Sequence, residues 1–277
     1  MPTLRGRNYQ LIELQTLWAP LYEAALDILG TTGVILPIGD PQHGQPDATT
    51  FKTVGEEQVT FTWGEAPDSF DVALDLTSPD SYQGIIPILS FNGTDEEADS
   101  PDDAYWSRDD TANEGFSLGA WAHIPDDANE KYLMSKWGSA AGTEEWRFGF
   151  GSAEKFHLAL SDESAGVLCY RSLNSSISRD RWVHVAATYD GGGGATAANG
   201  ITLYVDGVAT ASTATNDGGY VGMENDVGLV TLGQYNNSNF FKDKLAGGPC
   251  GPFFTQIELT ADAVKRLYQL QRIALGV

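Results

Sequence analysis

Residues 180–208 constrain the fold more than any other part of the chain. Apolar and polar residues alternate over 182–189 and again over 201–205, and alternation with a period of two is typical of half-buried β-strands. Asp190 and a run of glycines follow the first segment, and Asp206-Gly207, the dipeptide of a tight hairpin turn, follows the second. The stretch therefore predicts a strand, a loop, a second strand, a tight turn and a third strand.

Other short, aromatic-rich segments occur in an informative order. They are SFNG at 90–93, FSLGAW at 116–121, YLMSK at 132–136, WRFGF at 146–150, VTLG at 230–233 and LTADAVKRLY at 259–268. Together with WVHVAATYDG at 182–191 and GITLYVDG at 200–207, this order resembles the LamG-like domains of the concanavalin A-like jelly rolls, the lectin/glucanase superfamily. The resemblance covers the last two thirds of the chain and implies an all-β fold, an antiparallel two-sheet β-sandwich. It implies no activity, because one fold hosts many functions.

The same alternation places the remaining strands. We expect strands at 85–91, 116–124, 132–137, 145–150, 156–161, 166–172, 182–189, 201–205, 208–213, 227–232 and 252–257. Thr260 is a favourable N-cap, so a closing helix is expected over 263–270. This number and spacing of strands suits a sandwich or jelly roll.

The N-terminal part has a different pattern. Apolar residues at three- and four-residue steps predict an amphipathic helix over 8–29, with a kink or a break into two helices at Pro20. This helix either packs on its own sandwich or docks onto another subunit. Strands are expected at 58–63 and 70–76. We therefore expect a helix-plus-strand attachment segment at 1–81 and the LamG-like sandwich at 82–277.

The composition narrows the possible partners. The chain has 277 residues, with 38 Asp and Glu against 16 Lys and Arg, a formal net charge of −22. Nucleic acid and anionic membranes are therefore unexpected partners, because binding them requires basic groups. The acidity either recruits divalent cations or a basic partner, or it serves only as a solvated surface. Cys169 and Cys250 are expected to be free thiols, with a disulfide as the alternative.

The sequence gives little support for catalysis. Glycoside hydrolysis needs two carboxylates on one sheet face. Glu144-Glu145 would point to opposite faces, and Glu224-Asn225-Asp226 lies in an expected loop. The four histidines are scattered, with His184 expected as a sheet residue rather than a base. We therefore expect no enzymatic activity.

Two kinds of binding site are predicted. Many LamG-like domains bind calcium at the rim of the sandwich, and Asp95, Asp99, Asp102 and Asp103 are the candidate Ca²⁺ ligands, with a solvated acidic loop as the alternative. Sugar binding would use loop aromatics that stack on sugar rings and amides that bond the hydroxyls. The candidates are Tyr105, Trp106, Tyr235, Asn236 and Asn237, although each aromatic could also belong to the core or a strand end.

These features predict a non-catalytic structural or binding module. No export signal or membrane span is recognisable at the N-terminus, and with the acidic surface and extra N-terminal segment this favours a component of a larger assembly. The resemblance suggests a virion protein of the phage type, a capsid decoration or tail-associated protein whose N-terminal segment contacts capsid or tail subunits. The alternative is a free, extracellular, lectin-like carbohydrate-binding domain. A glycoside hydrolase or lyase is the third and least favoured function.

Overall fold

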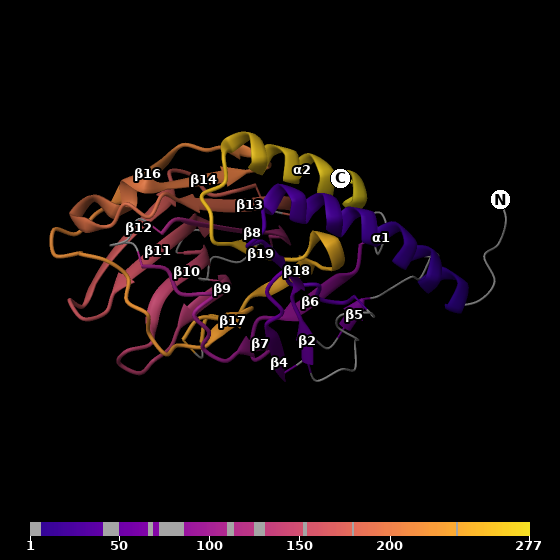
Figure 1. The fold of residues 1–277 in the computed structure, drawn as a ribbon, viewed down its shortest axis with the longest axis horizontal. Helices are drawn as coiled ribbons and strands as arrows, with labels where there is room; N and C mark the ends of the chain where they lie inside the picture. Colours follow the sequence, from indigo (N-terminus) through magenta and orange to yellow (C-terminus); the bar gives the residue numbers. More distant parts are fainter. Residues whose placement is uncertain are drawn as a thin grey trace.

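The alternating strands form two antiparallel sheets that pack face to face, as the sequence predicts (Figure 1). The computed structural model describes residues 7–40, 50–65, 69–71, 86–109, 114–124, 131–151, 154–178, 180–236 and 238–277. Within these residues, the core-facing side chains of both sheets form one large apolar cluster. The expected antiparallel β-sandwich is therefore confirmed.

The first sheet, sheet A, is built around β8 and β13. Its main path is β15 (Val208–Ala209), β14 (Ile201–Val205), β13 (Trp182–Tyr189), β8 (Phe116–His123), β18 (Lys242–Ala246), β6 (Ile88–Asn92) and β5 (Ser69–Asp71). Strands β1 (Val34–Ile35), β3 (Val54–Gly55) and β19 (Phe253–Thr255) join it through pairing of β19 with β8. Asp206 and Gly207 have φ angles of 50° and 74°, the positive values that a tight hairpin between β14 and β15 requires.

The second sheet, sheet B, is a longer meander. Its order is β16 (Ser212–Thr215), β12 (Val167–Leu173), β11 (Phe156–Asp162), β10 (Glu144–Phe150), β9 (Lys131–Trp137), β17 (Val230–Leu232), β7 (Glu97–Ser100), β4 (Thr60–Glu65) and β2 (Thr50–Lys52). The single strand expected over 208–213 is wrong, because β15 pairs with β14 in sheet A and β16 pairs with β12 in sheet B. The chain crosses between the sheets at residues 210–211.

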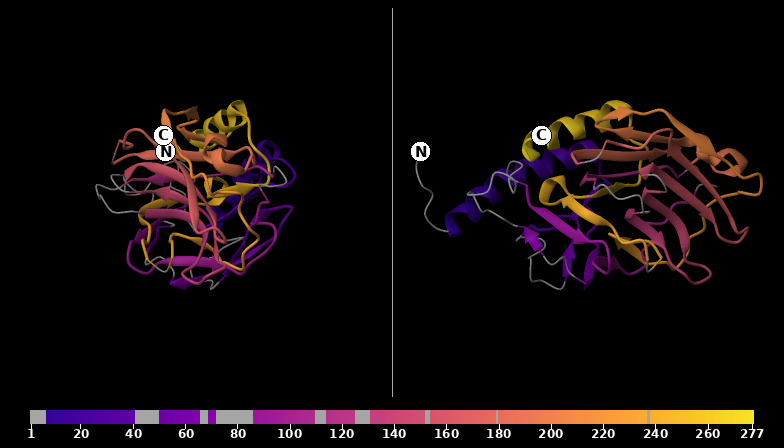
Figure 2. Two further views of the ribbon diagram at one scale, coloured as in Figure 1. Left: turned by 90° about the vertical axis from the view of Figure 1, so that its left-hand side faces the viewer. Right: turned by 180° about the vertical axis from the view of Figure 1, so that it is seen from behind.

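Two helices cover the outer face of sheet A. Helices α1 (Arg7–Leu29) and α2 (Ala261–Leu275) lie side by side above β8, β13 and β14 in Figures 1 and 2. Their buried apolar side chains form a second cluster with sheet residues such as Ala186 and Tyr204. The Thr260 side chain accepts a hydrogen bond from Ala263 N, which confirms the predicted cap. Neither helix of the described residues combines the length and apolar character needed to cross a membrane.

Helix α1 departs from the prediction at Pro20. It runs without a break from Arg7 to Leu29, although proline lacks the N–H of a regular helical turn. Trp18, Tyr22, Ala25 and Leu29 are buried on both sides of the proline. Packing of this stripe on the sandwich accounts for the continuous helix. For residues 16–29, the alternative in which α1 packs on its own sandwich is therefore the observed one.

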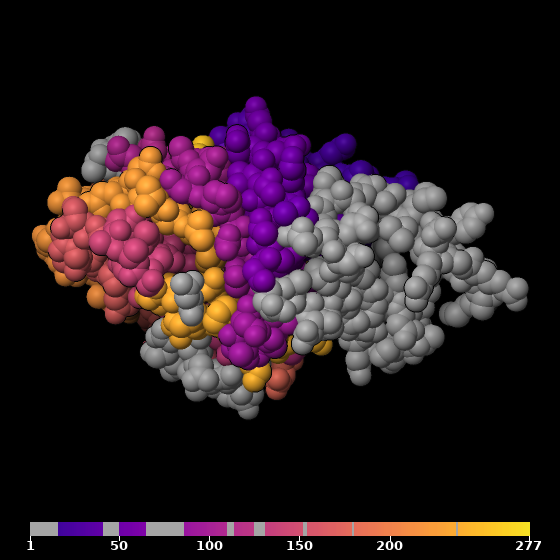
Figure 3. Space-filling view, turned by 90° about the horizontal axis from the view of Figure 1, so that it is seen from below, coloured from indigo at the N-terminus to yellow at the C-terminus, as the bar shows by residue number. Residues whose placement is uncertain are grey.

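Strands of the N-terminal segment extend both sheets. Strand β1 pairs with β19, whereas β2 pairs with β4 and β4 pairs with β7. Seen from below, the violet residues of β2 and β4 lie directly beside the magenta and orange residues of the sandwich (Figure 3). The expected domain boundary between residues 81 and 82 lies outside the described residues.

Both cysteines are buried thiols, and no disulfide joins them. Cys169 receives a hydrogen bond from Asp217 N, and Cys250 packs near α2, where its Sγ lies 3.6 Å from Gln271 O. Burial raises the pKa of Cys250. The expectation of thiols is confirmed.

Candidate functional site

The outer face of sheet B carries an ordered set of polar and aromatic side chains. Strand register places Tyr132, Gly149, His157, Ser172 and Thr213 in one row across five strands. A second row consists of Asp99, Thr231, Ser135, Arg147, Ala159, Tyr170 and Thr215. The alternate residues Phe148, Phe156, Leu158 and Leu160 belong to the core. Helices α1 and α2 both lie on the other sheet, so neither covers this face.

A groove of about 630 Å³ crosses these two rows. Ala159 lies between Arg147 and Tyr170 in the second row, and its small side chain leaves space that the flanking side chains enclose. The flanking residues that line the groove include Tyr132, Arg147, Lys155, His157, Tyr170, Ser172, Asn174, Thr213 and Thr215. Aromatic rings, hydroxyls, an amide and cations therefore face one cavity.

Arg147 lies at one end of the groove among three aromatic rings. Its guanidinium carbon is 4.5 Å from the ring centroid of Tyr235, 4.8 Å from that of Trp137 and 5.5 Å from that of Tyr132. Cation–π contacts of this kind fix the plane of the guanidinium group. Arg147 Nε and Trp137 Nε1 are buried and have no hydrogen-bond partner among the residues that the structure describes. The aromatic cluster therefore holds these two N–H donors in place, and no acceptor among the described residues bonds to them.

His157 is neutral at physiological pH. Burial lowers its pKa, the positive charge of Arg147 lowers it further, and the value is about 4 despite a hydrogen bond with the backbone of Lys155. His157 also packs edge-on against Tyr132, with ring centroids 5.4 Å apart. The imidazole thus contributes a neutral polar wall to the groove.

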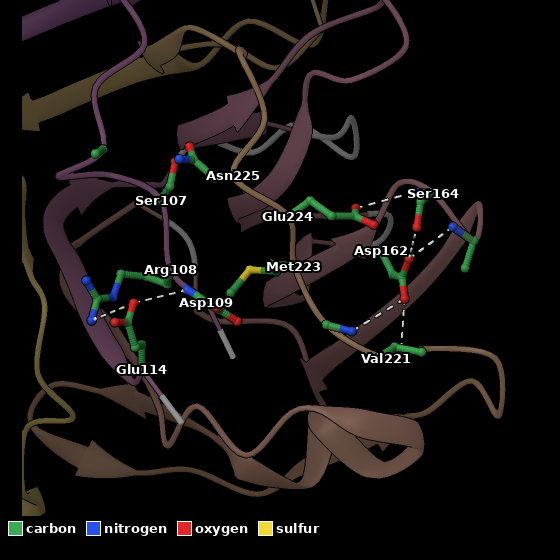
Figure 4. Close-up of a pocket in the computed structure, with 13 residues that line it drawn as sticks. Ser107, Arg108, Asp109, Glu114, Asp162, Ser164, Val221, Met223, Glu224 and Asn225 are labelled. Carbon is green, nitrogen blue, oxygen red and sulfur yellow. Dashed lines mark hydrogen bonds and ion pairs between the residues drawn. The ribbon is translucent and has the colours of Figure 1, made fainter. Parts of the chain in front are cut away.

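A second pocket, of about 600 Å³, opens at the rim of the sandwich (Figure 4). Its acidic side chains hold loops together. Asp162 accepts hydrogen bonds from Val221 N, Gly222 N, Ala165 N and Ser164 Oγ, and Figure 4 shows these bonds converging on one carboxylate. Burial raises the pKa of Asp162, but these hydrogen bonds outweigh burial and keep the pKa below its usual value.

The other acids of the rim pocket are engaged as well. Glu224 accepts from Glu163 N at 2.8 Å and Ser164 N at 3.3 Å. Glu114 lies 3.4 Å from Arg108. The rim pocket is therefore a set of loop anchors, and the groove on sheet B remains the better candidate site.

The structure separates the four aspartates predicted to bind calcium. Asp95 accepts from Asn92 Nδ2, and Asp103 accepts from Tyr105 N. Asp102 pairs with Lys136 at 2.9 Å, while Asp99 lies on β7. Among the described residues, no group of three or more His, Cys, Asp or Glu could hold a metal ion. This donor set does not fit the six to eight oxygens that calcium prefers. Calcium binding stays a prediction.

The predicted sugar-binding residues divide between core and groove. Tyr105 and Trp106 are only 8% and 0% exposed and belong to the core, which corrects their assignment as ligand residues. The Tyr105 hydroxyl donates to Thr32 O at 2.6 Å. Tyr235 contacts Arg147 and Tyr132 at the end of the groove, and Asn236 follows it in the loop. Asn237 lies outside the described residues.

Sequence reasoning missed a carboxylate pair on β7. Glu97 and Asp99 are two residues apart and share the outer face, because Ala98 between them is buried in the core. Burial and the charge of Asp99 raise the pKa of Glu97 to about 7, although a hydrogen bond with Gln234 opposes this. The Glu-x-Asp spacing was the signal that could have identified the pair. It is the same-face arrangement that glycoside hydrolysis needs.

Comparison with known proteins gives the family. The family model of the concanavalin A-like lectin/glucanases superfamily matches residues 92–246, which is more than half of the chain. The chain belongs to this superfamily. The match starts at the end of β6 and ends with β18, so it includes every strand that lines the groove. A search of curated proteins found no match.

Several solved structures have a fold similar to that of this chain. The binding domain of botulinum neurotoxin serotype G has 13% identity and a TM-score of 0.55, with 87% of this chain and 51% of that chain covered. The binding domain of botulinum neurotoxin DC in complex with SialylT has 12% identity and a TM-score of 0.56, with coverages of 87% and 52%. The binding domain of paraclostridial mosquitocidal protein 1 has 12% identity and a TM-score of 0.52, with coverages of 86% and 51%.

The chain thus spans about half the length of each of these structures. At such low identity the likeness shows the fold alone.

Proposed function

We propose that this protein is a non-catalytic carbohydrate-binding module whose ligand lies in the groove on sheet B. The observation that carries the proposal is the combination of rings, hydroxyls and unused donors around one cavity. Sugar rings present apolar faces to aromatic side chains and hydroxyls to polar groups, so a groove of this composition suits them. Membership of a superfamily that contains lectins is consistent with this proposal.

Filling the groove tests the proposal. Ala159→Leu adds bulk between Arg147 and Tyr170, and we expect it to weaken glycan binding by about tenfold or more, because an occluded cavity excludes the ligand. A glycan array with and without calcium first identifies a ligand, and calorimetry then measures the affinities. The matched control is Ala209→Leu, an exposed position on β15 of the other sheet, which should bind normally.

A second variant tests the proposal even if Ala159→Leu does not fold. Tyr170 is 37% exposed and lines the groove, so Tyr170→Ala can remove a stacking ring with little effect on the core. We expect affinity to fall several-fold while the thermal midpoint stays close to that of the unmodified protein. Unchanged affinity in both groove variants would place the ligand elsewhere. A silent array in both conditions would remove the proposal.

The pair Glu97 and Asp99 favours hydrolysis as a second candidate function. A carboxyl with a pKa of about 7 is suited to general acid catalysis. However, Glu97 Oε2 is buried and has no hydrogen-bond partner in the described part of the chain, and Gly64 lies so close that a Cβ there would meet Glu97 Oε1 at 1.8 Å. A substrate therefore has poor access to this carboxyl.

We expect no turnover when bound oligosaccharides are incubated with the protein and the products are analysed by mass spectrometry. Cleavage that is present in the unmodified protein and absent in Glu97→Gln would establish the hydrolase instead. Attachment of residues 1–81 to capsid or tail subunits, and with it localisation in a virion, stays a prediction from the sequence.

A further inference from the structure

The groove carries positive charge, whereas the whole chain is strongly negative. The protein has 38 acidic and only 16 basic residues, yet none of the described residues that line the groove is Asp or Glu. Arg147 and Lys155 both line it. Glu154, next to Lys155 in the chain, is 2% exposed and is not among the lining residues. The groove is thus a positive site on an acidic protein.

Neither groove cation is neutralised by the described part of the chain. Other cations have partners there: Lys136 contacts Glu145, Arg181 contacts Asp206, and Arg108 contacts Glu114. Arg147 lies against three aromatic rings, and among the described residues its Nε is buried without an acceptor. A cation that has no carboxylate partner in the protein and lines a groove is available to an oxyanion of a ligand.

The geometry of Arg147 specifies the type of acceptor. A guanidinium group is a planar fork of N–H donors that matches the oxygens of a carboxylate or a sulfate. The rings of Trp137 and Tyr235 lie 4.8 Å and 4.5 Å from the guanidinium carbon and limit its movement, so little conformational freedom is lost on binding. Hydroxyls of Ser172, Thr213 and Thr215 line the remainder of the groove and can bond neutral parts of a sugar.

We infer that the groove selects acidic glycans, with a carboxylate or sulfate substituent bound by Arg147 and Lys155. This inference rests on the proposed function and names its ligand class. An acidic sugar gains hydrogen bonds in which both partners are charged, whereas a neutral sugar offers these cations only hydroxyl and ring oxygens, which form weaker bonds. The strong negative charge elsewhere on the protein would repel polyanions from other surfaces, so binding is confined to this groove.

The test compares ligands that differ only in charge. Affinities are measured for a galacturonate oligomer and its methyl ester, and for a heparin-derived oligosaccharide and its desulfated form, to separate carboxylate from sulfate recognition. We expect the more anionic member of at least one pair to bind about tenfold or more tightly than its less anionic partner. We also expect that affinity to weaken as the NaCl concentration rises.

Charge-matched variants complete the test. Arg147→Met and Lys155→Met should each weaken binding of the acidic oligosaccharide about tenfold, and by clearly more than they weaken binding of a neutral glycan. The controls Arg266→Met and Lys265→Met remove the same charges from exposed positions on α2 and should bind normally.

The outcomes separate the two proposals. Equal binding of charged and neutral ligands that Ala159→Leu abolishes would overturn the inference and leave the proposed function in place. Absence of binding by every oligosaccharide would overturn both. Equal losses in the groove variants and the α2 controls would show that net charge alone governs binding, which also contradicts a specific site.

Discussion

Replacing Lys136 by methionine is expected to lower the free energy of unfolding by about 3–5 kcal/mol near pH 8, because the change leaves a buried carboxylate without its cation. The Lys136 and Glu145 side chains are both fully buried, and Nζ lies 2.5 Å from Glu145 Oε1. Lys136 also contacts Asp102 at 2.9 Å and donates to Asp226 O. One ammonium group thus joins β9, β10 and two rim loops.

The effect of pH gives this prediction a specific signature. Burial raises the pKa of Glu145 to about 7, although the charge of Lys136 and hydrogen bonds from Lys136, Ser107 and Asp226 N oppose the shift. The folded-state pKa therefore lies above the unfolded value, so the contribution of this group to stability is lost as pH rises through the folded pKa. Removing Lys136 raises that pKa further, and Glu145 takes up a proton in mildly acidic solution. We expect Lys136→Met to be less destabilising near pH 5.5 than near pH 8.

Chemical denaturation at the two pH values measures both effects. The double variant Lys136→Met/Glu145→Gln serves as control, because glutamine is neutral and its carbonyl can still accept from Ser107 Oγ and Asp226 N. It should recover a large part of the lost stability. A single variant that is equally destabilised at both pH values, or a double variant that is no better than the single one, would contradict the importance of charge at this position.

Local sequence patterns were sufficient to predict the strands whose bounds depend only on residues close to one another in the sequence. The predicted bounds of β13 and β14 are those observed, because clean alternation and the turn at Asp206-Gly207 determine both. The split between β15 and β16 could not be found in this way. Alternation gives the face of a strand but does not say which of two sheets a strand joins. Likewise, pairing of β1 with β19 connects residues near positions 35 and 253, and no local signal encodes it.

The candidate site was predictable only in part for the same reason. Tyr235 was identified from its loop position, whereas the segment around Arg147 looks like an ordinary core strand. Strand β10 has register irregularities between Glu144 and Trp146 and between Phe148 and Gly149, and such bulges decide which residues face outward. The stacking of Arg147 against Tyr235 also joins residues far apart in the chain. Long-range packing therefore creates the groove, while the residue types alone suggested only sugar binding.

Trp106→Ala is expected to lower the free energy of unfolding by about 3–5 kcal/mol, because the change empties a large space in the core. Trp106 is fully buried, and its ring centroid lies 5.1 Å from that of Phe254, 4.9 Å from that of Tyr105 and 5.9 Å from that of Phe61. Its carbonyl oxygen accepts from Trp146 Nε1 at 3.0 Å. The residue thus connects the N-terminal strand β4, the rim loop and β19.

Trp106→Phe distinguishes the cavity from other effects of the substitution. Phenylalanine retains most of the apolar contacts and removes the indole Nε1, which is buried and has no hydrogen-bond partner within the ranges that the structure describes. We therefore expect a loss of only about 1 kcal/mol for Trp106→Phe. Denaturation curves give the stabilities, and calorimetry at a temperature where both variants are folded gives the glycan affinity. Unchanged affinity is expected, because Trp106 contacts the core and not the groove. The role of Trp106 in the core would be contradicted if Trp106→Ala folded with near-normal stability but bound the glycan much more weakly. That result would show that this tryptophan belongs to the binding site.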